Sequence, residues 1–482
     1  MKHLIMICIL VLCFLPMIGS AEEVSLFPAK GENGKWGYID RQGSFVIPPQ
    51  FDGAGSFRGN YAVITVLPEG SAPLEDPDPF TMPDCQGVID RAGSIVLEPS
   101  YHLESGYDGD YYGGKDTGIW YVTGLRDLVR DEDEESVLPD NFAGFFDIPS
   151  GCFSGLKWTG IWPWISDSRL IPVSDGHFCA GYADRATGDL VIPCRYYSVD
   201  PSCFHGGVAS VSLIDEMGNP AGFYLIDEAG GTIPLPEGIH AVIYEGAFHG
   251  RVMVEDDSGL FGYADPMGQI VIPPGYVRAN SFKETPLGAA ATVLFAEGDW
   301  GVIDPDGNVL SRGIECGSWW GPDFKNGYRS EKTGENEYSL FDMMGNNVMT
   351  LTAENIVFLG TPMKNGLCWF AVGDRSSWLD ERYGLADLQG NIVADPAWLM
   401  PDLTEITEPS EGLKTVVQMI GGERKYGYLS VTGEAAIPCI YDEAEDFENG
   451  LARVRIGNRC GYIDHDGNEV YFWTDKSTNG EE

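Results

Sequence analysis

The sequence has few positively charged residues. Its 482 residues include 30 Lys and Arg against 73 Asp and Glu, a formal net charge of −43. A surface with this charge repels phosphate backbones and anionic lipid headgroups, which argues against nucleic-acid binding. Cations, basic proteins and neutral glycans are the favoured partners, and simple solubility outside the cell is the plainer explanation of the charge.

Catalytic and metal-binding motifs are also missing. The chain has no GxSxG, HExxH or P-loop sequence, and its cysteines show no CxxC or CxxH spacing. We therefore expect no enzyme activity, no cofactor and no metal site. Residues 304–308 and 464–468 resemble calcium-binding loops. Their glycine is the fourth residue rather than the sixth, so hairpin turns are the better interpretation.

Long apolar runs are absent after the first 21 residues. Residues 4–15 are almost entirely apolar, and the small residues that follow end in Ala21, a pattern typical of a secretory signal peptide cleaved after Ala21. A retained N-terminal anchor is the alternative. The sequence thus predicts a secreted or cell-surface protein with no integral membrane segment after signal cleavage. Export would permit disulfides, but no pairing of the mature chain's cysteines can be derived.

Turn-forming and aromatic residues, by contrast, are abundant. The chain contains 62 Gly, 30 Pro, 12 Trp, 22 Tyr and 23 Phe. Apolar residues seldom recur with the spacing of an amphipathic helix. This composition favours an all-β protein with short strands and frequent turns.

A motif repeats along the chain about every 40 residues. Its clearest copy is Trp36–Asp40, in which the order is aromatic, Gly, aromatic, Ile, Asp. A turn glycine and a β-branched run ending in proline follow, and a phenylalanine comes later. About eleven copies are centred on these residues: Gly37, Gly87, Gly144, Gly181, Gly222, Gly262, Gly301, Ser339, Gly384, Gly427 and Gly461.

Each repeat predicts about three strands. The motif alternates like a strand, and its glycine would allow close approach of a neighbouring backbone or ring. Asp-x-x-Gly is a hairpin turn, and the proline closes an edge strand. Such a unit cannot bury its faces alone, so neighbours must stack. Both a propeller-like arrangement and an open twisted β-array fit. Eleven copies exceed an ordinary propeller, which would then need two rings or shared blades.

These residues resemble the WG-repeat family, also called KWG repeats. The Trp-Gly pair occurs at Trp36-Gly37 and Trp300-Gly301, and the order Gly-Tyr-Ile-Asp, Gly, Val-Ile-Pro-Pro, Phe-x-x-Gly is that of the family. The resemblance extends from about residue 30 to 472. It implies a bacterial β-repeat protein with a binding or surface role, and it says almost nothing about activity.

The repeats divide the chain unevenly. We expect a signal peptide at 1–21, WG-type repeats at 22–100, a diverged region with an insertion at 101–175, and a repeat array at 176–482. The diverged region contains an aromatic stretch. Its rings, together with a second pair, could stack on sugars, or they could pack a weak junction between repeats: Trp158, Trp162, Trp164, Trp319 and Trp320.

Three functions fit the sequence. The first is an exported scaffold that binds a protein or glycan ligand without catalysis. The second is a glycan-hydrolysing enzyme with paired carboxylates in a propeller channel, and the third is a purely structural envelope protein. Carboxylate pairs are frequent in a chain with 73 acidic residues, so pairing alone does not favour the enzyme. The first hypothesis is preferred because repetition is uniform and no catalytic residues cluster.

Overall fold

Every secondary-structure element in the described part of the protein is a β-strand. The structure is a computed structural model, and it describes residues 24–474 except 71–84, 108–115, 125–141, 163–166, 176–178, 198–201, 216–219, 243–245, 286–287, 315, 317, 319–320, 323, 374–380 and 402–407. Within these residues, no helix has the length and apolar character needed to cross a membrane. The predicted all-β fold is confirmed.

The strands form eleven blades, numbered here in chain order, and each blade carries one copy of the motif on a central strand. Blade 1 consists of β1 (Phe27–Lys30), β2 (Trp36–Ile39) and β3 (Phe45–Phe51), and blade 2 of β4 (Gly53–Ala54), β5 (Tyr61–Thr65), β6 (Gln86–Asp90) and β7 (Ile95–Tyr107). Blade 3 consists of β8 (Asp116–Gly124), β9 (Ala143–Asp147) and β10 (Cys152–Phe153), and blade 4 of β11 (Gly160–Ile161), β12 (Leu170–Ser174), β13 (Cys179–Asp184) and β14 (Leu190–Tyr197).

The remaining blades repeat this plan. Blade 5 consists of β15 (Val208–Ile214), β16 (Pro220–Asp227) and β17 (Thr232–Ile233), and blade 6 of β18 (Ile239–Ala241), β19 (Val252–Asp256), β20 (Phe261–Ala264) and β21 (Ile270–Tyr276). Blade 7 consists of β22 (Arg278–Ala279), β23 (Ala291–Ala296), β24 (Asp299–Ile303) and β25 (Val309–Ile314), and blade 8 of β26 (Tyr328–Gly334), β27 (Glu337–Asp342) and β28 (Asn347–Thr352). Blades 9 to 11 are formed by β29 (Ile356–Leu359), β30 (Cys368–Val372), β31 (Arg382–Ala386) and β32 (Ile392–Trp398); β33 (Leu413–Ile420), β34 (Glu423–Ser430) and β35 (Ala435–Tyr441); and β36 (Glu443–Ala444), β37 (Ala452–Ile456), β38 (Arg459–Ile463) and β39 (Glu469–Thr474). All pairing is antiparallel, and the pairs β7–β8 and β14–β15 join two neighbouring blades into one sheet.

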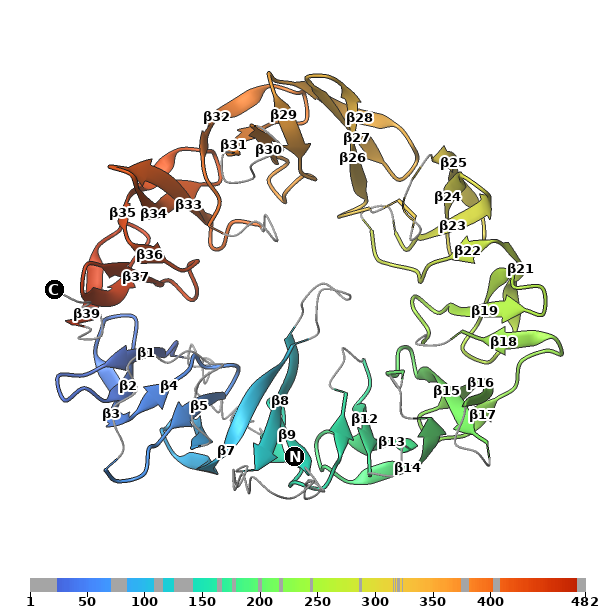
Figure 1. The fold of residues 1–482 in the computed structure, drawn as a ribbon, viewed down its shortest axis with the longest axis horizontal. Coiled ribbons are helices and arrows are strands. Elements are labelled where there is room, and N and C mark those ends of the chain that lie inside the picture. The colour runs from blue at the N-terminus through green and yellow to red at the C-terminus, as the bar shows by residue number, and fades with distance from the viewer. Residues whose placement is uncertain are drawn as a thin grey trace, which may run out of the picture.

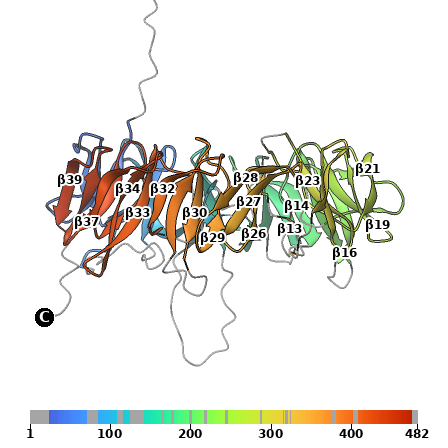
Figure 2. The same cartoon turned by 90° about the horizontal axis from the view of Figure 1, so that it is seen from above.

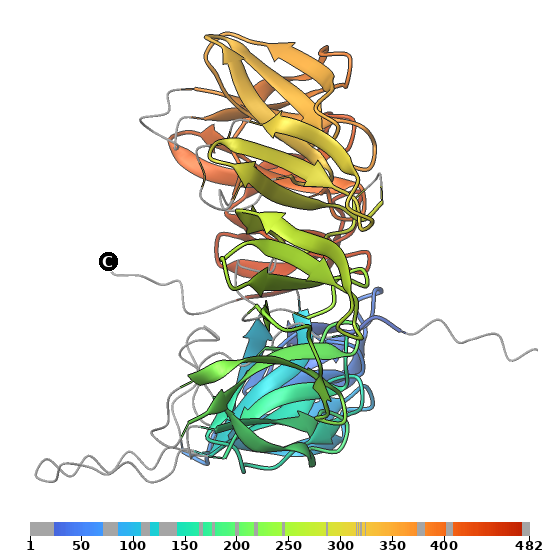
Figure 3. The same ribbon diagram turned by 90° about the vertical axis from the view of Figure 1, so that its right-hand side faces the viewer.

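The blades form one closed ring. Figure 1 shows the blades arranged in a ring, with last strands such as β3, β14 and β39 at the rim, and Figures 2 and 3 show a single layer of blades. Blade 11 packs against blade 1, where the rings of Trp36 and Trp473 lie 5.6 Å apart between centroids. The arrangement is thus propeller-like, and the open array is excluded. The expected need for two rings or shared blades is wrong, because one wide ring holds all eleven blades.

A bulge within the blade requires the motif glycine. In blade 1 the pairing of β2 with β3 shifts register between Trp36 and Tyr38. A Cβ on Gly37 would lie 2.4 Å from the carbonyl oxygen of Ile47, closer than real contacts allow. Equivalent contacts of 2.3 to 2.6 Å to a carbonyl oxygen occur at Gly87, Gly144, Gly181, Gly262, Gly301, Gly384, Gly427 and Gly461. The predicted close approach of a neighbouring backbone is confirmed.

The motif tyrosine connects one blade to the next. The hydroxyl of Tyr38 donates to Gly55 O at 2.9 Å, where the chain enters blade 2. In blade 11 the hydroxyl of Tyr462 donates to Pro28 O of blade 1 at 2.9 Å, across 434 positions of sequence. Burial raises the pKa of both hydroxyls above the ordinary tyrosine value, so both remain protonated donors. Ring closure therefore uses the same contact as the junction between blades 1 and 2.

The turn glycine of ten of the eleven blades packs against the preceding blade. Gly93 has a φ of 80°, and a Cβ there would meet the side chain of Ile47 in blade 1 at 3.0 Å. A Cβ on Gly43 of blade 1 would meet Val470 O of blade 11 at 2.7 Å. Glycine suits these turns because it adopts positive φ without strain and has no side chain to separate the blades. Contacts within 4 Å of the preceding blade are shared by Gly43, Gly93, Gly151, Gly188, Gly230, Gly268, Gly307, Gly390, Gly433 and Gly467.

Replacing Tyr462 by Phe tests the closure. In a closed ring, Tyr462→Phe leaves the buried carbonyl of Pro28 without its donor and lowers the free energy of unfolding by about 1–3 kcal/mol. Tyr263→Phe, which removes the matching bond to Asn280 O within the chain, should cost a similar amount. Urea denaturation followed by circular dichroism measures both. If Tyr263→Phe lowered the free energy of unfolding and Tyr462→Phe left it unchanged, the result would contradict ring closure.

Candidate functional site

The first tryptophan of the aromatic stretch belongs to the core. Trp158 is 5% exposed and packs with Phe145 and Val173 between blades 3 and 4. The ammonium of Lys157 lies 5.6 Å from the centre of its ring. This position matches the packing alternative, because a sugar could reach the ring only by displacing core side chains.

Of the other tryptophans proposed to stack on sugars, Trp162 is the one that the structure describes. It is half-buried, and its ring covers Gly160, where an added Cβ would meet Cη2 at 2.8 Å. Trp164, Trp319 and Trp320 lie outside the described residues. Stacking of sugars on these four rings stays a prediction.

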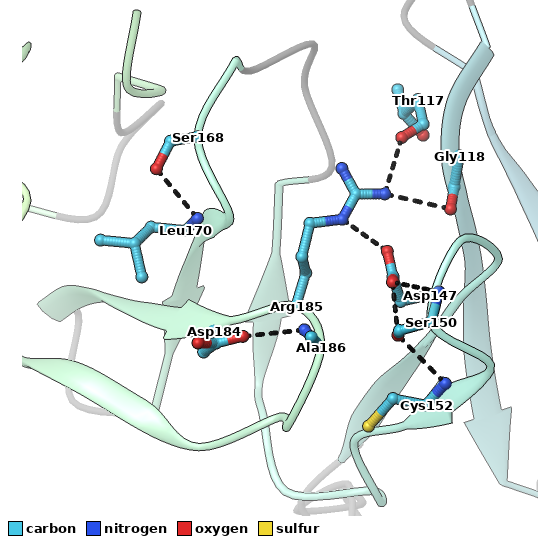
Figure 4. A network of polar contacts seen from close by, with 10 residues as sticks. All are labelled: Thr117, Gly118, Asp147, Ser150, Cys152, Ser168, Leu170, Asp184, Arg185 and Ala186. Atoms are coloured by element: carbon cyan, nitrogen blue, oxygen red, sulfur yellow. Dashed lines mark hydrogen bonds and ion pairs between the residues drawn. The ribbon is translucent and has the colours of Figure 1, made fainter. Parts of the chain in front are cut away.

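A buried ion pair joins blades 3 and 4 (Figure 4). Nε of Arg185 donates to Oδ1 of Asp147 at 2.5 Å, and Nη2 donates to the carbonyl oxygens of Thr117 and Gly118 at 3.2 Å each. Oδ2 of Asp147 accepts from the backbone amide and hydroxyl of Ser150. The side chains of Arg185 and Asp147 are 18% and 2% exposed. Both groups have their hydrogen bonds within the protein, so we assign this network a structural role.

The calcium-like sequences are turns. Oδ1 of Asp304 accepts the backbone amides of Asp306 and Asn308, and its Oδ2 accepts the Asn308 side-chain amide. Asp464 makes the same set of hydrogen bonds in blade 11. Each of these carboxylates is engaged with its own hairpin. No cluster of three or more metal-ligating side chains is found within the described ranges.

Blade 8 carries a polar network on one side of its sheet. The hydroxyl of Ser339 lies 3.0 Å from that of Thr333 and 2.9 Å from that of Thr350, and the Asn347 amide donates to Thr350 Oγ1 at 3.0 Å. Thr333 also donates to Glu337 at 2.9 Å. We call this surface the blade 8 polar face and define it by Arg329, Glu331, Thr333, Glu337, Ser339, Asn347 and Thr350.

The polar face points toward blade 7. Tyr338 and Leu340 of β27 pack into blade 9, so the alternate residues Ser339 and Phe341 lie on the opposite side. Ser339 is paired directly with Thr350 in a straight stretch of β27 and β28. The side chain of Ser339 thus occupies the place of the motif glycine, and its hydroxyl lies within hydrogen-bond distance of Thr333 and Thr350.

The junction between blades 7 and 8 departs from the other ten. Ser311 is paired with Val302 in blade 7. The corresponding pair in blade 1 is Ile47 with Tyr38, so Ser311 takes the position of Ile47. Its buried hydroxyl has no hydrogen-bond partner among the described residues. The turn glycine of blade 8, Gly345, has no described atom within 4 Å of its Cβ position.

An apolar contact from the same turn still holds the two blades together. Met343 of blade 8 is 3% exposed and packs with Trp300 and Ile314 of blade 7. The junction between blades 7 and 8 is therefore apolar at the turn that contains Met343 and polar along the strands of blade 8.

Arg329 is the one arginine of the polar face, and its side chain is 13% exposed. It forms an ion pair with Glu331 through Nη1, and its guanidinium lies 4.8 Å from the centre of the Phe341 ring. Its Nε and Nη1 are buried, and neither has a hydrogen-bond partner within the described residues. Burial lowers the pKa of this guanidinium from its ordinary value. A buried, charged donor without an acceptor costs free energy, which an incoming anionic group would offset.

Two departures from the repeat mark this junction in the sequence. Ser339 takes the place of the motif glycine. Residues 328–334 are polar, whereas the strand before the motif strand in blade 7, residues 291–296, is apolar. Neither departure alone predicts a site, because a polar residue marks a site only if the neighbouring blade places polar groups opposite it. Strand register supplies that information.

The motif itself identifies the family. A model described as "WG containing repeat" matches residues 36–66, 181–216, 261–284 and 426–460. The chain therefore contains WG repeats. Each matched segment of this WG-repeat protein includes residues of a motif strand, here β2, β13, β20 and β34.

Other comparisons are distant. No curated protein matches the WG-repeat chain. A eukaryotic initiation factor structure is similar with a TM-score of 0.37 and 10% identity, covering 77% of this chain and 95% of that one. BamB from Moraxella catarrhalis gives 0.27 and 14%, covering 56% and 79%, and AztD from Citrobacter koseri gives 0.30 and 11%, covering 65% and 92%. At these values the similarities carry no conclusion about function.

Replacing Arg185 by Met tests the structural role of the buried pair. The substitution leaves the Asp147 carboxylate buried without its cation, so we expect the free energy of unfolding to fall by about 3–5 kcal/mol. The double variant Arg185→Met, Asp147→Asn removes both charges and should recover part of the loss. Chemical denaturation of the three proteins measures this. Equal stability of the Arg185→Met variant and the wild type would show that the pair is not structural.

Proposed function

We propose that this WG-repeat protein is an exported scaffold that binds a glycan ligand and does not catalyse a reaction. The observation that carries the proposal is the blade 8 polar face. Ten junctions place a turn glycine against the preceding blade, while the junction at Gly345 has instead an unpartnered buried hydroxyl and a set of hydroxyl, amide and carboxylate groups. Loss of the glycine contact together with this set of polar groups supports a specialised site at the junction.

The chemistry of the polar face favours a sugar over a protein ligand. Thr333, Asn347 and Thr350 are exposed and provide both donors and acceptors, which match the hydroxyl groups of a glycan. A protein interface would need a buried apolar or aromatic centre, and the exposed side chains here are polar. A protein ligand is the alternative outcome of the test below.

Export is part of the same proposal. Residues 1–21 have the composition of a signal peptide and lie outside the described residues. The net charge of −43 suits a secreted or cell-surface protein that remains soluble and avoids anionic polymers. The presence of residues 1–21 on protein recovered from the native host would contradict cleavage.

A glycan array and a cell-wall pull-down test the binding function. The chain without residues 1–21 should bind a subset of glycans saturably, with and without calcium. Thr333→Val with Thr350→Val removes two exposed hydroxyls at nearly constant shape and should weaken binding about tenfold. Thr187→Val, in an exposed turn of blade 4, is the matched control. Trp162→Ala tests the separate stacking hypothesis.

Three results would go against the proposal. Release of reducing ends from a bound glycan over time would favour the hydrolase. Binding to host proteins with no glycan binding would favour a protein ligand. Equal losses for the blade 8 double variant and the Thr187 control would remove the polar face as the site.

A further inference from the structure

We propose that the blade 8 polar face recognises a sugar that carries a single carboxylate, and that the guanidinium of Arg329 receives that carboxylate. This inference rests on the glycan-binding function proposed above and adds the chemical class of the ligand. It concerns an anion site inside a strongly acidic protein, which the net charge alone does not suggest.

Arg329 has two buried donor atoms that lack an acceptor. Nε and Nη1 have no hydrogen-bond partner among the described residues, although Nη1 lies in an ion pair with the carboxylate of Glu331. The guanidinium also lies 4.8 Å from the centre of the Phe341 ring, a favourable cation–π contact. A planar, oriented guanidinium edge matches the two oxygens of a carboxylate, and such charge-assisted bonds are stronger than neutral ones.

The surrounding groups fit a sugar. Ser339, Thr333 and Thr350 form a chain of hydroxyls on the same side of the sheet as Arg329. From blade 7, the Ser311 hydroxyl is buried without a partner at the junction with blade 8. A carboxylate on a hydroxyl-bearing ring would thus meet a cation and several neutral donors and acceptors within one junction.

The charge of the protein limits the ligand to one negative charge per recognised unit. A polyanion would be repelled by a surface with net charge −43 and by Glu331 and Glu337 on the polar face itself. A single carboxylate gains the Arg329 contact at close range, while its repulsion from distant surface charges is screened by salt. We therefore infer a monoanionic sugar and not a polyuronate.

Isothermal titration calorimetry tests the inference on the chain without residues 1–21. Glucuronic acid and N-acetylneuraminic acid are the monoanionic probes, glucose is the neutral probe, and polyglucuronate and a short glutamate peptide are the competing anions. We expect the monoanionic sugars to bind best. Arg329→Gln should weaken that binding about 10- to 100-fold. Arg312→Gln, which removes an exposed arginine of β25 paired with Asp299, should leave it unchanged.

A second variant separates loss of binding from loss of folding. Ser311→Ile installs the residue found at the equivalent position of blades 1, 4, 6 and 10, so the variant should fold with an unchanged or higher melting temperature. Its larger apolar side chain should fill the junction beside the polar face and weaken sugar binding. Unchanged binding by folded Ser311→Ile would contradict the placement of the site.

The outcomes separate this inference from the function on which it rests. Equal binding of glucose and the acidic sugars, unaffected by Arg329→Gln, would overturn the carboxylate proposal and leave the scaffold function. Tighter binding of the glutamate peptide would overturn the sugar class. If calorimetry detected no binding of any sugar while the glycan array was positive, the carboxylate proposal would also be overturned. If neither assay detected binding, the scaffold function would be overturned.

Discussion

Each blade of this ring is too small to bury its own faces, so the contact between neighbouring blades is the interaction on which the whole structure depends. Two parts of the repeat make that contact. In the blades that have it, the motif tyrosine donates into the entrance of the next blade, and in ten blades the turn glycine packs against the preceding blade. Both parts recur where blade 11 meets blade 1, through Tyr462 and Gly43. Ring closure thus uses the same contacts as other junctions, together with aromatic packing between Trp36 and Trp473.

Much of the local structure could be predicted from the sequence. Alternation at Trp36–Asp40 predicts a central strand, Asp-x-x-Gly predicts the turn, and Gly37 predicts a close backbone approach. These features depend on residues that are neighbours in the sequence or one strand apart. Closure could not be predicted in this way, because Tyr462 and Pro28 are 434 positions apart and no local pattern links them.

The candidate site was hidden for a related reason. Ser339, Ser311 and Arg329 are ordinary residues in an acidic, hydroxyl-containing sequence, and their importance comes from facing one junction. The tryptophans gave a stronger sequence signal, but Trp158 shows that an aromatic residue beside a weak repeat can equally belong to the core. In a repeat protein, positions that depart from the repeat on facing sides of one junction are therefore a second guide to candidate sites, beside unusual residues.

Single-particle cryo-electron microscopy of the full mature chain tests the central claim most directly. The account predicts class averages that show one closed ring of eleven blades, with blade 1 in contact with blade 11 and a single layer of blades in edge-on views. An open arc, a helical array or two smaller rings would contradict it, because each requires that Tyr462 and Gly43 lack the partners on which closure depends.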